Sequence, residues 1–318
     1  MNKNTLLQVS EIVSHAGCPD GIGAAMICNA AYASCGMHPP PTNFVQYGTR
    51  FHDNLVSRPK QLFVDITPPK GRWEEWMGLD PVVLDHHETV MYVVNSLNGE
   101  YGGADHSGAM LAFENVMLPL AGDSMQKQDL ESWERLARLC MVRDTWKTAS
   151  PDWDDACALA HALLLYGQKW GVSAAIAGKV PLDELLPVGA KVHDKIRRQS
   201  KGIIRNSPRR DIKIGDASVT VAFFNHANGG TMSDIAHFVM DLMPCNAVVS
   251  YFFIYDNEEV QNIASVRTDG CFSARELAES FGGGGHNNAA GFRIPGEYSP
   301  NQIIDMVMKR IVSLNAKE

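Results

Sequence analysis

The chain has 318 residues, of which 45% are hydrophobic and 20% charged, and its formal net charge is −8. This length accommodates two ordinary domains, each with its own core, and the composition is that of a soluble globular protein. Because affinity for long nucleic acid depends on neutralising phosphates, a chain this acidic is not expected to coat such a polymer.

The sequence also bears on the compartment. No segment has the roughly 18 unbroken apolar residues of a membrane span, and residues 1–4 lack the charged and apolar regions of a signal peptide. Seven cysteines without CxxC pairs favour a reducing compartment over a disulfide framework. We therefore expect a cytoplasmic protein that does not bind membranes.

The first half of the chain alternates between strands and helices. Apolar runs predict strands at 6–14, 44–47, 62–66 and 82–85, with helices at 22–33 and 73–77 between them. This alternation predicts an α/β domain with a mostly parallel sheet and helices on its faces. After Gly102 and Gly103 the pattern becomes helical. One apolar helix face is formed by Leu130, Trp133, Leu136, Ala137, Cys140 and Met141, and a second helix covers 156–165.

A basic segment separates this half from the next. Residues 191–210 contain eight Lys or Arg and one acidic residue. We interpret the segment as a solvated linker helix; the alternative is a cationic edge that attracts an anionic substrate. The predicted domains are therefore 1–190 and 211–318, with a linker at 191–210.

The second half has a different pattern. It predicts strands at 217–224, 247–255, 261–267 and 290–294, rich in β-branched and aromatic residues. Helices are expected at 232–243, 273–280 and 301–314. These elements predict a smaller, mixed α/β domain.

Polar side chains follow one buried strand abruptly. The apolar residues at 82–84 end in Asp85-His86-His87, at the carboxyl end of a strand, where open α/β sheets bind ligands. Taken alone, these histidines are explained equally well by bonds to neighbouring carbonyls and by a metal site.

Further carboxylates and imidazoles stand at other element ends, and they favour the metal site. His15, Cys18 and Asp20 lie in the turn after the first strand, Asp65 follows a later strand, and Asp144 ends a periodic helix. Such a set of ligands suits Mn²⁺ or Mg²⁺ and accepts Zn²⁺ or Co²⁺. Two cations roughly 3.5–4 Å apart, joined by a bridging carboxylate, would hold the attacking and the leaving oxygen of a displacement at phosphorus.

Together with a downstream run of four glycines and His286, these motifs closely resemble the DHH phosphoesterase superfamily with its DHH-associated C-terminal domain. The resemblance covers nearly the whole chain in order and spacing. It implies a parallel-sheet DHH catalytic domain, a C-terminal substrate-binding domain and a water between two metals as the nucleophile.

The resemblance also implies roles for individual residues. One metal would be held by Asp20, Asp65, His86 and Asp144, and the other would involve His15 and Asp65. In the catalytic Asp85-His86-His87 motif, Asp85 would orient its neighbours. His87 would face the substrate phosphate as a hydrogen-bond donor or as the acid for the leaving group.

Cys18 departs from the family pattern, because most members have Asp-x-Asp in this turn. A thiolate suits soft or borderline cations and suits Mg²⁺ poorly. Cys18 is therefore either a metal ligand that biases the site towards Zn²⁺ or Mn²⁺, or a small buried residue beside a weaker second site. Some members of the superfamily carry a similar His-x-x-Cys-Pro-Asp-Gly turn.

The second domain carries the expected substrate-binding residues. Consecutive glycines are typical of an anion-binding turn and equally of a flexible loop; the flanking helix and strand favour an ordered turn. The resemblance implies that Arg267 and the glycine run bind a terminal phosphate, and that Ser107 lies near the substrate. An ordinary salt bridge and helix capping are the respective alternatives. The run consists of Gly283, Gly284 and Gly285, preceded by Gly282 and followed by His286.

The resemblance is closest in function to nanoRNases and linear-dinucleotide phosphodiesterases. It implies a Mn²⁺-dependent hydrolase of short oligonucleotides, linear dinucleotides or nucleotide 3′,5′-bisphosphates. A phosphate held by the second domain would limit substrate length. Two alternatives stay open: a polyphosphate or pyrophosphate hydrolase, and a non-catalytic nucleotide sensor. A homodimer is compatible with the sequence.

Overall fold

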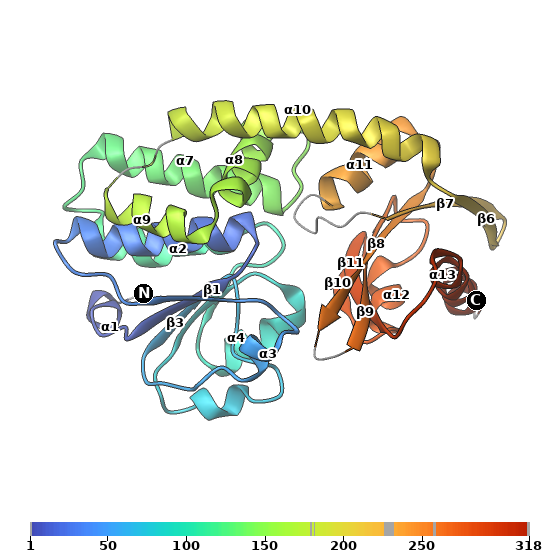
Figure 1. Ribbon diagram of the computed structural model, residues 1–318. Helices are drawn as coiled ribbons and strands as arrows, with labels where there is room; N and C mark the ends of the chain where they lie inside the picture. Colours follow the sequence, from blue (N-terminus) through green and yellow to red (C-terminus); the bar gives the residue numbers. More distant parts are fainter. Residues whose placement is uncertain (1, 179, 181, 226–231, 257–258, 317–318) are drawn as a thin grey trace. The chain divides into compact units, whose positions relative to one another are not determined.

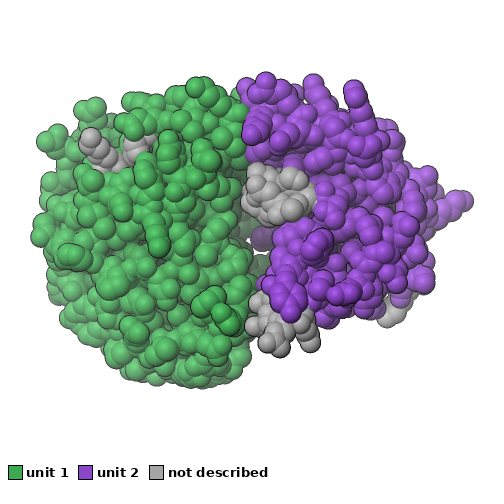
Figure 2. Space-filling view, in the orientation of Figure 1, with its two compact units in different colours: residues 1–193 green, residues 194–318 purple. Residues whose placement is uncertain are grey.

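The computed structural model describes residues 2–178, 180, 182–225, 232–256 and 259–316. It contains two compact units, residues 1–193 (unit 1) and residues 194–318 (unit 2), which Figure 2 shows in different colours. Helix α10 (Leu182–Asn206) crosses the boundary between them. Most of the segment that we predicted as a linker is therefore helical, with Ile196 and Ser200 buried on one side while the lysines and arginines are exposed on the other. The last two residues of the segment begin strand β6 (Arg209–Ile214).

Unit 1 is built on a five-stranded sheet with the strand order β2-β1-β3-β4-β5, in which every neighbouring pair is parallel. The strands are β1 (Glu11–His15), β2 (Thr42–Val45), β3 (Gln61–Val64), β4 (Val82–Asp85) and β5 (Glu100–Tyr101). The predicted α/β class with a parallel sheet is confirmed.

Helices cover both faces of this sheet (Figure 1). On one face α2 (Pro19–Ser34) contacts the strands, and α7 (Lys127–Asp144), α8 (Trp153–Tyr166) and α9 (Gln168–Ile176) pack against α2. On the other face α4 (Met91–Ser96) contacts β4 and β5, and α3 (Arg50–Asp53) lies on the same side. Because side chains alternate along a strand, Leu62 and Val64 enter the first core and Phe63 enters the second. Both faces are thus buried, as in other parallel sheets. The remaining short helical segments are α1 (Lys3–Leu6), η1 (Trp73–Trp76), η2 (Glu88–Val90), α5 (Gly108–Ala112), η3 (Phe113–Met117) and α6 (Leu118–Ala121).

The first predicted strand, at 6–14, is partly wrong. Leu6 ends helix α1, which Asn2 caps by accepting a hydrogen bond from the backbone N–H of Asn4, and the strand starts only at Glu11. Leu6 is fully buried. A short apolar run has the same composition in a buried helix as in a buried strand, so periodicity could not separate the two.

Unit 2 contains a six-stranded mixed sheet with the order β10-β11-β9-β8-β7-β6, in which only β7 and β8 are parallel. Its core lies between the sheet and helices α12 (Ala274–Glu279) and α13 (Pro300–Asn315). Ser299 and Gln302 form a capping box at the start of α13. The other elements are β7 (Ala217–Asn225), α11 (Met232–Leu242), β8 (Ala247–Asp256), β9 (Glu259–Thr268), β10 (Gly284–His286) and β11 (Ala289–Pro295).

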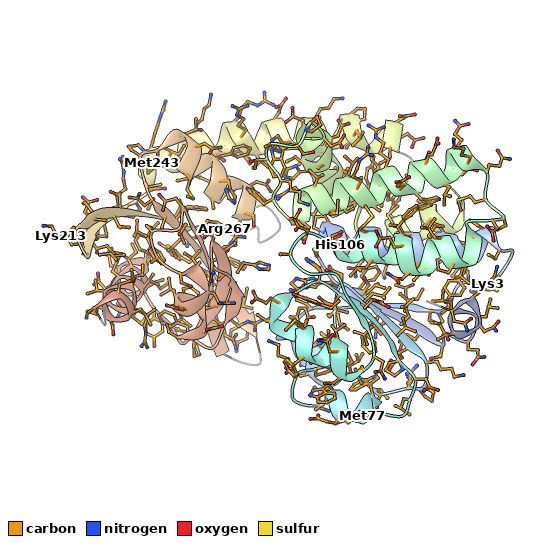
Figure 3. The ribbon with its side chains drawn as sticks, turned by 180° about the vertical axis from the view of Figure 1, so that it is seen from behind. Lys3, Met77, His106, Lys213, Met243 and Arg267 are labelled. Carbon is orange, nitrogen blue, oxygen red and sulfur yellow. The ribbon has the colours of Figure 1, made fainter. Side chains whose placement is uncertain are left out.

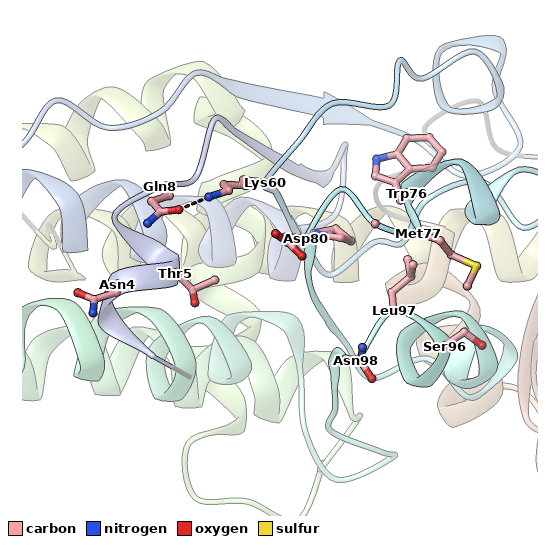
Figure 4. Close-up of a pocket in the computed structure, with 12 residues that line it drawn as sticks. Asn4, Thr5, Gln8, Lys60, Trp76, Met77, Asp80, Ser96, Leu97 and Asn98 are labelled. Carbon is pink, nitrogen blue, oxygen red and sulfur yellow. Dashed lines mark hydrogen bonds between the residues drawn. The ribbon is translucent and has the colours of Figure 1, made fainter.

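A pocket of about 430 Å³ opens at the amino edge of the unit 1 sheet (Figure 4). Its lining residues include Lys60, Pro81 and Asn98, which stand just before strands β3, β4 and β5. In the part of the chain that the structure describes, no helix combines the length and the apolarity needed to cross a membrane.

Candidate metal centre

The opposite, carboxyl edge of the unit 1 sheet contains the point where the strand order reverses. The chain passes from β1 to β2 on one side and then to β3 on the other, so the reversal lies between β1 and β3. Ligands of open α/β sheets bind at such a point. His15 is the last residue of β1 and Asp65 follows β3; their Nδ1 and Oδ2 atoms are 3.4 Å apart.

Asp65 is held in an unusual backbone conformation. Its φ is +58°, in the left-handed region, and its side chain is fully buried. Helix α5 begins directly against it: a Cβ on Gly108 would lie 2.3 Å from the Cβ of Asp65. Position 108 therefore requires glycine for this approach. Contacts with His15 and His86 hold the pKa of Asp65 below its ordinary value, although burial alone would raise it.

Asp20 comes from the first turn of α2 and is buried beside the same helix start. Its carboxylate accepts hydrogen bonds from the backbone N–H groups of Gly108 at 2.6 Å and Ala109 at 3.1 Å. Burial, followed by the charges of Asp65 and Asp144, raises the pKa of Asp20. A site that resists further negative charge in this way favours the arrival of a cation.

His86 joins these carboxylates from the loop after β4. Its Nε2 atom lies 3.4 Å from Oδ1 of Asp65 and 3.2 Å from Oδ2 of Asp144, the last residue of α7. Burial alone would lower the pKa of His86, but Asp65 and Asp144 raise it to about 10. The carboxylates thus stabilise positive charge at this position.

His87 is oriented by Asp85. Oδ1 of Asp85 lies 2.8 Å from both the backbone nitrogen and the Nδ1 atom of His87. Burial lowers the pKa of His87, but the charge of Asp85 and this hydrogen bond raise it to about 9. The other carboxylate oxygen, Oδ2, accepts a hydrogen bond from the hydroxyl of Tyr47 at 3.1 Å.

The ligand atoms form overlapping groups. Each group has three residues whose ligand atoms lie within 4.8 Å of one another. The groups in unit 1 are His15, Cys18 and Asp65; Asp20, His86 and Asp144; and Asp65, His86 and His87. Burial, with the nearby charges of Asp65, Asp144 and Asp20, raises the pKa of the Cys18 thiol. All six residues predicted as metal ligands therefore come together at one edge of the sheet; their binding of metal stays a prediction.

Several buried polar atoms at the carboxyl edge of the sheet lack hydrogen bonds among the described residues, which fits a bound cation at this edge. Both ring nitrogens of His15, both carboxylate oxygens of Asp65 and Nε2 of His86 are buried, and none has a hydrogen-bond partner in the described part of the chain. Four of these five atoms make ion-pair contacts with one another at 3.4 Å, but none forms a hydrogen bond. Buried polar atoms nearly always form hydrogen bonds in folded proteins, so the lack of them requires an explanation. Divalent cations bound by these imidazole and carboxylate atoms would satisfy them.

Ser107 is fully buried, and its hydroxyl accepts a hydrogen bond from the backbone N–H of Met110, which caps α5. The capping alternative is thus realised, and contact of Ser107 with substrate stays a prediction.

In unit 2, Arg267 lies on β9 and is labelled in Figure 3. Its guanidinium donates to the Ser265 hydroxyl at 2.9 Å, the Val266 carbonyl at 2.8 Å and the Ser233 hydroxyl at 2.5 Å. These bonds fix the orientation of the planar fork. Fixing it in advance lowers the entropy cost of binding an oxyanion.

The glycine run differs from the expected turn. Gly284, Gly285 and His286 form strand β10, which pairs with the beginning of β11, and the neighbouring β11 residue Ala289 pairs with Arg267. A Cβ on Gly285 would lie 2.6 Å from the Ala289 carbonyl oxygen, so the strands approach more closely than other residues allow. The run and Arg267 thus flank the same end of β11. Binding of phosphate by Arg267, Gly283, Gly284, Gly285 and His286 stays a prediction.

Two features of the site were missed in the sequence. Tyr47, two residues beyond β2, belongs to no motif, although a tyrosine after a strand at the carboxyl edge is a weak signal. The backbone N–H groups that bind Asp20 could not be found, because a backbone donor leaves no side-chain signature.

Residues 216–313 match the family model of the DHHA1 domain. No curated protein matches the sequence. Solved structures do, over nearly the full length. The pGpG-specific phosphodiesterase PggH from Vibrio cholerae is 13% identical, with a TM-score of 0.54, and the match covers 97% of this chain and 99% of that one.

Two further solved structures are similar. An exopolyphosphatase-related protein from Bacteroides fragilis is 14% identical, with a TM-score of 0.57 and coverage of 98% of this chain and 95% of that one. The DHH domain of a member of a ribosomal protein family is 12% identical, with a TM-score of 0.61 and coverage of 97% and 88%. At such identities the similarity shows the fold.

The DHHA1 match, the DHH fold and the Asp85-His86-His87 motif at the carboxyl end of β4 agree with one another. Residues 216–313 of the second unit thus match the DHHA1 domain, and the chain as a whole has the fold of the solved DHH-domain structure.

Proposed function

We propose that the protein is a metal-dependent phosphoester hydrolase that cleaves short oligonucleotides, linear dinucleotides or nucleotide 3′,5′-bisphosphates. The observation that carries the proposal is the pair of ligand groups that meet at Asp65, whose buried oxygens have no hydrogen-bond partner in the described residues. Both oxygens of this carboxylate are buried without a hydrogen bond, and an imidazole lies on each side of it. Such a carboxylate is suited to bridge two cations.

The residues divide between two cation positions. Asp20, Asp65, His86 and Asp144 would hold one cation, and His15, Asp65 and Cys18 the other. When bound, such cations supply an activated water and neutralise charge on the phosphate. The backbone N–H groups of Gly108 and Ala109 keep the Asp20 carboxylate in position.

His87 is suited to proton donation. Because Asp85 is at the Nδ1 side of its ring, Nε2 is the nitrogen that can give a proton to the leaving oxygen. The charge of Asp85 and its hydrogen bond to Nδ1 raise the pKa of His87 to about 9 in the metal-free protein, which favours the protonated ring. The protonated imidazole can serve as the general acid.

Unit 2 would supply the binding step. The oriented guanidinium of Arg267 would attract a phosphate through its positive charge. Together with the glycine run and His286, it would bind the terminal phosphate of the substrate and so favour short substrates. The acidic net charge agrees with substrates that are small.

The thiol of Cys18 bears on the choice of cation. Mn²⁺ is our first choice for the cofactor, with Co²⁺, Zn²⁺ and Mg²⁺ as alternatives, because a thiolate disfavours Mg²⁺. Replacement of Cys18 by aspartate should therefore strengthen Mg²⁺ binding relative to Co²⁺. It should also abolish the sulfur-to-cobalt charge-transfer absorption that the Co²⁺-loaded protein would show.

Turnover of a small panel tests the proposal. Metal-free protein, resupplied with Mn²⁺, Mg²⁺ or Zn²⁺, is assayed on pGpG, pApA, pAp and a five-nucleotide RNA. We expect Mn²⁺-dependent cleavage that His86→Ala abolishes. Arg267→Ala should raise KM by about 10- to 100-fold, the equivalent of losing a charged hydrogen bond. Arg310→Ala, which changes an exposed arginine on α13 of the same unit, is the matched control.

Polyphosphate is the second candidate substrate, favoured by the similarity to the Bacteroides fragilis exopolyphosphatase-related protein. Phosphate release from polyphosphate or pyrophosphate, with none from the nucleotides, would replace our proposal by that activity. Nucleotide binding without any turnover, unchanged in Cys18→Asp and Asp85→Ala, would indicate a sensor.

A further inference from the structure

Tyr47 makes an unusual set of contacts behind the candidate metal centre. Its hydroxyl lies 3.1 Å from Oδ2 of Asp85 and 3.0 Å from the backbone nitrogen of Thr67. Thr67 follows Asp65 by two residues, so the phenol connects the loop after β3 with the end of β4. These two loops carry Asp65 and the Asp85-His86-His87 motif.

The direction of the two hydrogen bonds follows from chemistry. A backbone N–H can only donate, so the Tyr47 oxygen accepts from Thr67. A carboxylate oxygen can only accept, so the phenol donates its proton to Asp85. Tyr47 is thus a donor to Asp85, and its orientation is fixed from the Thr67 side.

Both oxygens of Asp85 are consequently engaged. Oδ2 accepts from Tyr47, while Oδ1 accepts from the backbone N–H and from Nδ1 of His87. Asp85 is fully buried. A buried carboxylate bound on both oxygens cannot rotate without breaking a hydrogen bond, so the plane of the His87 ring is set through it.

Aromatic contacts hold the Tyr47 ring in turn. The ring meets His52 edge-on at a centroid distance of 5.0 Å, and it meets His15 edge-on at 5.4 Å. Nε2 of His52 lies 2.9 Å from the Thr67 carbonyl oxygen. The backbone of Thr67 thus anchors Tyr47 through its N–H and His52 through its carbonyl.

We propose that Tyr47 is a positioning residue for the reaction: it fixes Asp85, and through Asp85 it aims His87 at the leaving oxygen. The inference rests on the proposed phosphoester hydrolysis and adds a residue to it. Its consequence is specific, because only substrates that need a proton at the leaving oxygen depend on the aim of His87.

Tyr47→Phe tests this by removing one oxygen and keeping the ring. We expect kcat for a linear dinucleotide to fall about 10- to 100-fold, as is typical for residues that orient a catalytic group. Hydrolysis of a p-nitrophenyl ester of a nucleotide should fall less than about threefold, because nitrophenolate leaves without protonation. The number of Mn²⁺ ions bound per chain should not change.

Two further variants separate positioning from folding. Tyr32→Phe is the matched control, because it also removes a buried tyrosine hydroxyl, bonded to the Leu6 carbonyl at 2.7 Å, in the same unit. This variant should leave kcat unchanged for both substrates. In an Asp85→Asn background, adding Tyr47→Phe should cause little further loss, since the pathway through Asp85 is already broken.

A measurement without turnover completes the test. In protein labelled with ¹⁵N-histidine, the Nδ1 proton of His87 should exchange with water about tenfold faster in Tyr47→Phe than in the wild type. Equal loss on both substrates, or an unchanged exchange rate, contradicts the role of Tyr47. Wild-type protein that cleaves no phosphoester contradicts the proposed function instead, while the exchange rate still decides the question of Tyr47.

Discussion

The two edges of the unit 1 sheet differ in whether their polar groups are exposed to water or buried. At the amino edge, the pocket of about 430 Å³ is lined by exposed residues such as Asp80 and Asn98. At the carboxyl edge, Asp65 and His86 are buried, and their facing atoms lack hydrogen-bond partners in the described residues. Exposed polar groups form hydrogen bonds with water, whereas buried polar groups cannot. The candidate site proposed here is therefore marked by buried polar atoms that lack hydrogen bonds, and not by the size of a pocket.

Backbone conformation alone does not separate the two edges. Left-handed φ values occur at Asp65 (+58°) and also at Lys60 (+60°), Asp80 (+51°) and Asn98 (+54°) around the pocket. Turns before strands commonly contain such residues. The difference is that Asp65 combines this conformation with complete burial, so that the strain aims a carboxylate at two imidazoles.

The largest contrast should come from removing one charge at each edge. Asp65→Asn and Asp80→Asn are matched, because both residues have left-handed φ values and asparagine tolerates them. We expect Asp65→Asn to lower kcat by about a thousandfold or more and to abolish tight Mn²⁺ binding, because it removes the residue that we propose as the shared ligand. Asp80→Asn should change neither. Enzyme kinetics measure kcat, and calorimetric titration measures Mn²⁺ binding. Equal losses in the two variants would contradict the distinction between the edges.

A methyl group added at each edge should have a smaller effect. A Cβ would lie 2.3 Å from the Asp65 Cβ in Gly108→Ala and 2.4 Å from the Val83 carbonyl oxygen in Gly99→Ala. Both variants should lose about 1–3 kcal/mol of unfolding free energy, since both overpack the structure. Only Gly108→Ala should also weaken Mn²⁺ binding, because only it would displace Asp65, a proposed ligand. Weaker binding in both variants would indicate a general loosening of unit 1.

The smallest effect concerns pH in protein stripped of metal. Because the folded pKa of His86, about 10, exceeds its ordinary value of 6.5, this group stabilises the fold fully below pH 6.5. That contribution is lost as the pH rises through 10. The depressed pKa of Asp65 acts in the opposite sense: its contribution is present above the ordinary value of 3.8 and is lost at lower pH.

We therefore expect the Tm of the metal-free protein to fall between pH 7 and pH 10. The fall should be smaller in His86→Ala and unchanged in Asp80→Asn, as scanning calorimetry would show. A Tm that rises over this range would contradict the arrangement of His86 between two carboxylates.

Much of the fold was predictable, because local patterns determine it. The strand at 82–85 was predicted with its observed bounds, and the carboxylates and imidazoles at element ends were predicted to gather, since parallel strands end at a common edge. Strand β10 was not predicted, because a glycine-rich segment has no strand propensity and pairs only through its register with β11.

The missed parts of the site depend on contacts between distant residues. Tyr47 follows β2 without a motif, and its role exists only because Thr67 and Asp85 lie on either side of its hydroxyl. The need for glycine at position 108 likewise arises from Asp65, more than forty residues away in the chain. Neither relation has a periodicity that a single sequence could reveal.

The most direct test of the central claim is anomalous diffraction from crystals grown with Mn²⁺. We expect two peaks at the carboxyl edge of the unit 1 sheet, roughly 3.5–4 Å apart and bridged by the carboxylate of Asp65. One should be bound by Asp20, His86 and Asp144, and the other by His15 and Cys18. No peak at this edge, or Mn²⁺ bound instead in the pocket at the amino edge, would contradict our account.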